Sequence, residues 1–214
     1  MDNNRKDKEM TKEEKYKLLI SARNFHYDNF NKWLTYFYIA IGALFVGYSS
    51  VVSSPKENIM LEYLLIILGF IVSLLWYWSA KGYYYWNINF ISLVNYYETD
   101  VLEFNEKEKV YSFFANKKTQ NNFFSPTSGA NISTSKVAIL FAFIIASSWA
   151  FIFFYTLFNH IWNWCAICTI VISIVLSLLI VRVSAYIPKH YMQSYIDHFP
   201  DLKLKQDPLP DDTK

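Results

Sequence analysis

The stretch VAILFAFIIASSWAFIFFYTLFN, residues 137–159, contains no Asp, Glu, Lys or Arg. It is one of four uncharged runs, and the others cover residues 33–55, 63–80 and 161–181. The runs are 18 to 23 residues long, and a helix needs about 20 apolar residues to cross a bilayer core. Because lipid cannot hydrogen-bond the backbone, a spanning segment must satisfy its own N–H and C=O groups. The sequence therefore predicts an all-α membrane protein with four transmembrane helices.

Basic residues are distributed unevenly around these runs. Of the 20 Lys and Arg residues, eight precede the first run, six lie in residues 81–136 and five follow the fourth run. Only Lys56 lies between the first two runs, and none lies between the last two. Loops that stay in the cytoplasm carry the excess of Lys and Arg. We therefore expect both termini and residues 81–136 to be cytoplasmic.

This threading divides the chain into five segments. They are a cytoplasmic N-terminal tail and amphipathic helix (1–32), a first transmembrane hairpin (33–80), a cytoplasmic helix with a loop or hairpin (81–136), a second transmembrane hairpin (137–182) and a cytoplasmic C-terminal tail (183–214). The turn of the second hairpin is expected at Asn159 and His160. Mostly polar residues precede the first run, so we expect it to act as an uncleaved anchor and not as a signal peptide.

The segment before the first run has a helical pattern. Residues at helical spacing form a stripe of Leu19, Ala22, His26, Phe30 and Trp33. Residues 11–41 contain no Pro or Gly. The pattern favours one continuous helix over residues 12–52, about 60 Å long at 1.5 Å per residue; a helix lying in the headgroup plane is the alternative. Similar spacing after Lys81 predicts that the second crossing also extends into the cytoplasm, to about Phe104.

Residues 105–135 have a different character. The stretches KVYSFFAN (109–116) and NFFSP (122–126) flank a polar turn. Short aromatic-rich runs joined by a polar loop are typical of a β-hairpin, and we predict a small one here.

Three stretches carry a resemblance to a known family. They are SARNFHYDNFNKWLTYFYIAIGALFVGYSS (21–50), LGFIVSLLWYWSAKGYYYWNINFISLVNYYETDVL (68–102) and NISTSKVAILFAFIIASSWAFIFF (131–154). Together they resemble the RipA family of octameric bacterial inner-membrane proteins. Two features depart from the family pattern: Lys81 stands where an arginine is expected, and Trp86 is followed by Asn-Ile-Asn. The resemblance implies a homo-oligomer, an octamer, in the bacterial inner membrane, and it implies no family-wide chemistry.

Four basic residues mark the cytoplasmic ends of the four crossings: Lys32, Lys81, Lys136 and Arg182. They are expected to set the topology and to contact anionic lipid headgroups. A dedicated lipid pocket between subunits is the alternative. Four tryptophans are predicted to pack at interfaces, because buried aromatic side chains dominate many interfaces: Trp33, Trp78, Trp86 and Trp149.

Three groups of polar residues are candidate sites. Cys165 and Cys168, with His160, have a spacing that a redox pair or a metal site would use, but a lone CxxC in an apolar run is more typical of small buried residues. Arg23, His26, Asp28 and Lys32 either form a pH-sensitive cluster or snorkel from an interfacial helix, and we favour the second. Glu98, Asp100 and Glu103 either bind a cation or are solvated beside Lys107 and Lys109, and we favour solvation.

None of the four runs contains a charged residue, whereas ion pathways and proton relays ordinarily use intramembrane ionisable groups. The sequence therefore favours a non-enzymatic oligomeric scaffold, with no cofactor, that uses a cytoplasmic ring to organise the envelope membrane or an unknown cytoplasmic partner. A pore or stress-responsive channel is the alternative, lined by Ser147, Ser148, Thr156, Asn163 and Ser173. Nucleic acid is not expected as a partner, because the basic residues are interleaved with acids.

Overall fold

Four long helices dominate the computed structural model, which describes residues 10–56, 58–110, 122–161 and 166–192. They are α1 (Lys12–Val52), α2 (Ile59–Tyr96), α4 (Thr134–Ile161) and α5 (Ala166–Val183). A short π-helix, η1 (Tyr97–Val101), extends α2, and a short helix, α6 (Tyr186–Tyr191), follows α5. All four long helices have the length and composition needed to cross a membrane, which confirms the predicted all-α class.

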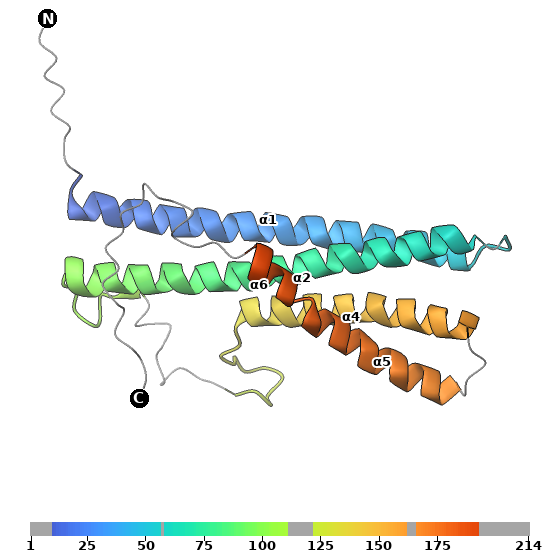
Figure 1. The fold of residues 1–214 in the computed structure, drawn as a ribbon. Helices are drawn as coiled ribbons and strands as arrows, with labels where there is room; N and C mark the ends of the chain where they lie inside the picture. Colours follow the sequence, from blue (N-terminus) through green and yellow to red (C-terminus); the bar gives the residue numbers. More distant parts are fainter. Residues whose placement is uncertain (1–9, 57, 111–121, 162–165, 193–214) are drawn as a thin grey trace, which may run out of the picture.

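Helices α1 and α2 form a long antiparallel hairpin, and α4 and α5 cover only one half of it (Figure 1). Lys136, near the start of α4, lies beside Tyr84 of α2, so α4 begins about midway along the hairpin. We call the four-helix half the bundle. We call the two-helix half, residues 12–30 and 83–101, the stalk.

The helix starts are stabilised by side chains of the expected types. Thr11 and Glu14 form a capping box, in which the Thr11 hydroxyl accepts from the Glu14 N–H at 3.2 Å and Glu14 accepts from the Thr11 N–H at 2.8 Å. Asn58 accepts from the Leu61 N–H at the start of α2, and Ser133 accepts from the Lys136 N–H at the start of α4. Each cap satisfies an N–H group that the helix itself leaves free.

Two fully buried tryptophans organise the bundle where α1, α2 and α4 meet. Trp76 of α2 is 0 % exposed and contacts the rings of Phe37, Tyr38 and Phe141. Ring centroids 4.5 to 7 Å apart are the favoured range for aromatic pairs, and these three lie 5.1 to 6.0 Å from Trp76. The second tryptophan, Trp149 of α4, is also 0 % exposed.

Helix α5 packs through small polar residues. Thr169, Ser173 and Ser177 are its buried side chains, together with Val181. The Ser173 hydroxyl donates to the Thr169 carbonyl at 2.7 Å, so it needs no partner on another helix. Small residues let helices approach closely in lipid, where no hydrophobic effect drives them together. Val181 completes a cluster with Leu74 of α2 and Ala146 of α4.

Helix α1 is far more exposed than the others, and Ile41 is its only buried residue. The continuous helix predicted over residues 12–52 is confirmed. The predicted stripe is wrong at Trp33, which is 54 % exposed, because the packed face passes through Leu34 instead. A helix advances 3.6 residues per turn, so position 33 or 34 follows Phe30 equally well by spacing alone.

Two further predictions are wrong in detail. Asn159 and His160 do not form a turn, since α4 continues through both to Ile161; the pair contains no Gly or Pro to end a helix.

NFFSP forms no strand: Asn122 accepts from the Phe124 and Ser125 N–H groups, and its own N–H donates to the Gly129 carbonyl, so residues 122–129 form a compact loop. Most of the other predicted strand, KVYSFFAN, lies outside the described residues.

Candidate functional site

The outer end of the stalk is fixed by one buried carboxylate. Glu98 lies in η1 and is 0 % exposed. Its Oε1 accepts from the Tyr16 hydroxyl of α1 at 2.6 Å and from the Val110 N–H at 3.2 Å. Lys12 donates from Nζ to the Val101 carbonyl at 3.3 Å, which adds a second link between the two chain segments. Glu98 therefore joins the start of α1 to the end of α2 and to the turn after it.

The predicted solvation of the acidic group is correct for two of its three members. Asp100 and Glu103 are exposed, whereas Glu98 is buried. The Oε2 atom of Glu98 has no hydrogen-bond partner among the described residues. No group of three or more metal-ligating side chains occurs in that part of the chain, so no cation site is found there.

The base of the stalk is a stack of three rings. Tyr83 of α2 lies 3.5 Å from Phe30 and 4.9 Å from His26, centroid to centroid, and is nearly parallel to both. The polar cluster, which was the less favoured alternative, is not found: His26 packs on aromatic rings, while Asp28 and Lys32 are exposed. His26 Nε2 is buried and has no hydrogen-bond partner within the described ranges.

Two of the four predicted interface lysines and arginines contact aromatic faces at the junction of stalk and bundle. Lys81 Nζ lies 5.4 Å from the Tyr77 ring centroid, and Lys136 Nζ lies 6.0 Å from that of Tyr84. All four side chains are exposed. Cations over aromatic rings are attracted by the ring quadrupole, so Lys81 and Lys136 are each held beside a tyrosine of α2.

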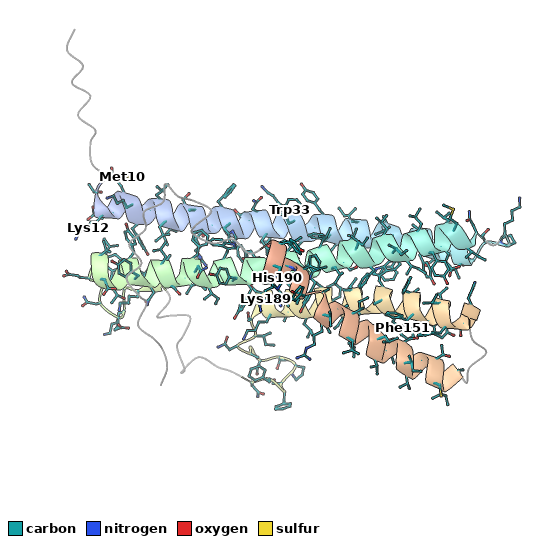
Figure 2. All side chains as sticks on the ribbon, viewed as in Figure 1. Met10, Lys12, Trp33, Phe151, Lys189 and His190 are labelled. Carbon is teal, nitrogen blue, oxygen red and sulfur yellow. The ribbon has the colours of Figure 1, made fainter. Side chains whose placement is uncertain are left out.

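Away from the packed face, the stalk exposes many large apolar side chains, and Figure 2 shows side chains projecting from both helices along the stalk. The exposed set is Leu18, Phe25, Tyr27, Tyr85, Trp86, Ile88, Leu93 and Tyr96. Phe25 is 69 % exposed and Trp86 is 50 % exposed. Large exposed apolar patches mark interaction sites on soluble surfaces. We call this set the stalk surface.

The four predicted tryptophans lie in three environments. Trp33 and Trp86 are exposed on α1 and α2, Trp78 is partly buried, and Trp149 is fully buried inside the subunit. Their part in contacts between subunits stays a prediction. Sequence reasoning missed Trp76 and Tyr83, which pack at two helix junctions. Both belong to an aromatic-rich stretch around Lys81. The sequence alone does not distinguish the few buried rings of this stretch from the many that are exposed.

The remaining candidates are only partly described. Cys165 and Asn163 lie outside the described residues, and Cys168 is free and exposed. Ser173 is buried in the helix packing inside the subunit, so its side chain does not line a channel through a single subunit. The other predicted pore-lining residues differ: Ser147, Ser148 and Thr156 are partly exposed on α4.

The comparisons with known proteins agree with this architecture. No curated protein and no solved structure matches the chain. The model of the octameric membrane protein family (8xMP) matches residues 13–158, which include α2 and nearly all of α1 and α4. The narrower resemblance to RipA stays a prediction, whereas the multi-pass, oligomeric membrane character follows from the match and from the four apolar helices. The chain belongs to the octameric membrane protein family (8xMP).

Proposed function

We propose that this protein is a homo-octameric scaffold of the bacterial inner membrane, with the bundle in the bilayer and the stalk in the cytoplasm. The distribution of Lys and Arg supports this orientation. So does the geometry, because Lys81 and Lys136 lie where the bundle ends and the stalk begins. Both termini are then cytoplasmic.

The stalk surface is the observation that carries the proposal. In the bundle, exposed apolar side chains face lipid and need no protein partner. In water, a hairpin of two helices that exposes Phe25, Tyr85 and Trp86 leaves apolar area unburied. Contact with neighbouring stalks removes that area from water. Aromatic residues are also the residue type most enriched at interfaces.

Identical subunits close into a ring when two different faces of each subunit meet in a head-to-tail contact. The eight stalks then form a cytoplasmic ring on a membrane-embedded base, and the ring presents a repeated surface to a cytoplasmic partner. No group of three or more His, Cys, Asp or Glu side chains that could hold a metal ion occurs within the described residues, and the role that we propose is non-enzymatic.

Mass photometry of the purified protein in mild detergent tests the assembly. The wild-type particle should have eight times the 25.3 kDa subunit mass. The double variant Phe25→Ser/Trp86→Ser should dissociate into smaller species, while Ile167→Ser, a change at an exposed position of α5 in the bundle, should remain octameric. An octamer that survives the double variant unchanged would overturn the role of the stalk.

A second candidate function, a pore, is favoured by one observation. Ser147, Ser148 and Ser177 line a groove of about 470 Å³ between α4 and α5, on an otherwise apolar surface. The Ser147 hydroxyl has no hydrogen-bond partner among the described residues, and a water-filled lumen between subunits would supply one. Ion and solute flux from liposomes separates the functions: the scaffold predicts no flux, and flux that Ser147→Val/Ser148→Val abolishes supports the pore.

A further inference from the structure

A cavity of about 580 Å³ lies within one subunit, between α2 and the corner that joins α5 to α6. The wall on α2 includes Lys81 and Gly82, and the wall on α6 includes Pro188 and Lys189. Figures 1 and 2 show α6 and the labelled Lys189 beside the middle of α2, close to the start of α4. The cavity therefore lies where the bundle meets the stalk.

The charge of the cavity walls has one sign. Lys81 and Lys189 are its two charged lining residues, and no Asp or Glu among the described residues lines it. Neither lysine forms an ion pair with another described residue. Two lysines on facing walls, with no carboxylate beside them, favour the binding of an anion, because the anion reduces the repulsion between their positive charges.

The cavity is apolar at its other end. Leu75 lies six positions before Lys81, so it lies roughly 9 Å deeper toward the bundle at the rise of an α-helix. Trp78 lies between these levels and also lines the cavity, while its indole nitrogen is buried within the subunit. The cavity thus offers two lysines at one end and apolar side chains at the other.

We propose that this cavity binds an anionic phospholipid of the cytoplasmic leaflet. The phosphate lies between Lys81 and Lys189, and an acyl chain begins along Trp78 and Leu75. The assignment rests on the proposed orientation, in which this level of the molecule meets the headgroups. Free inorganic phosphate satisfies the lysines alone, whereas a phospholipid also fills the apolar end.

Native mass spectrometry of the detergent-purified protein measures the binding directly. The probes are phosphatidylglycerol, phosphatidylcholine and inorganic phosphate, each added at matched concentrations. Phosphatidylglycerol should bind more tightly than phosphatidylcholine, and inorganic phosphate should not displace it. Equal binding of the two lipids would overturn the recognition of charge, and displacement by inorganic phosphate would assign the site to the free anion.

Charge variants locate the site. Lys81→Gln or Lys189→Gln should weaken phosphatidylglycerol binding about five-fold each, and the double variant about thirty-fold, at the usual strength of a lysine near an anionic surface. Lys136→Gln is the matched control, because Lys136 lies at the same level and does not line the cavity. Equal weakening by Lys136→Gln would mean that a general basic belt binds the lipid, and the cavity would be excluded.

Gly82 provides a test that leaves the charge unchanged. A Cβ at Gly82 would have no heavy atom within 4 Å, so a side chain there enters open space. Gly82→Leu should block the lipid while it stabilises α2, because leucine favours the helix more than glycine does. Unchanged lipid binding in this variant would overturn the proposal. The same spectra report the number of subunits, so loss of lipid is distinguished from loss of assembly.

Discussion

The Trp149 indole lies directly against the backbone of Gly69. A Cβ built at Gly69 would be 2.5 Å from both Cδ2 and Cε2 of that ring. Phe45 stacks on the indole at a centroid distance of 4.5 Å, and Tyr48 contacts its edge at 5.8 Å. Because the atoms that a methyl group would meet belong to a rigid, fully buried ring, α2 and α4 can approach this closely only with glycine at position 69.

Gly69→Ala should therefore destabilise the bundle, by about 1–3 kcal/mol, the usual effect of overpacking a filled core. The free energy of unfolding in detergent, measured by titration with SDS, checks this. Gly42→Ala is the control, because a Cβ at Gly42 meets no heavy atom within 4 Å. If the clash is the cause, Gly69→Ala should lower the free energy of unfolding less in a Trp149→Leu background than in the wild type. An equal loss in the two backgrounds would contradict the clash.

Trp76 and Trp33 should respond differently to truncation. Trp76→Ala removes a fully buried ring and should lower the free energy of unfolding of the subunit by about 3–5 kcal/mol. Trp33→Ala removes a ring that is 54 % exposed and should change it by less than about 0.5 kcal/mol. Thermal unfolding in detergent compares the two, and equal losses would contradict the packed face assigned to α1.

Tyr16→Phe should loosen the outer end of the stalk. It removes the 2.6 Å hydrogen bond to the buried Glu98 carboxyl group, and hydrogen bonds to charged groups are worth about 1.5–3 kcal/mol. Hydrogen exchange should accelerate in residues 12–20 and 97–110 and stay unchanged in the bundle. Tyr27→Phe, at an exposed ring on the same helix, serves as the control. Unchanged exchange at the Val110 amide would show that Glu98 does not hold this end together.

The number and extent of the long helices could be predicted from sequence because hydropathy reports which segments lie in lipid. Uncharged runs located all four helices, and the absence of Pro and Gly from residues 11–41 indicated that α1 begins well before its uncharged run. Hydropathy cannot report how each helix is rotated about its axis in lipid, because apolar side chains are favoured on every face. The misplaced Trp33 and the unrecognised contact of Gly69 with Trp149 have this cause.

The burial of Glu98 was not predicted, for a different reason. Neighbouring Asp100 and Glu103 are exposed, and the composition of YETDVLE, residues 97–103, resembles a solvated helix end. The carboxyl group is buried because α2 changes to a π-helix at Tyr97 and because Tyr16, 82 positions earlier, approaches it. Tyr16 lies three positions before Leu19 and so extends the α1 stripe, which was the only available signal. Contacts at such separations depend on how α1 and α2 are aligned.

Cysteine labelling in spheroplasts tests the proposed threading, on which the cytoplasmic stalk and the lipid site both depend. In a Cys165→Ser/Cys168→Ser background, single cysteines replace Ser54, in the connection between α1 and α2, and Asn89, an exposed position of the stalk. A membrane-impermeant maleimide should label Ser54→Cys in intact spheroplasts and should label Asn89→Cys only after lysis. Labelling of Asn89→Cys in intact spheroplasts would contradict the account.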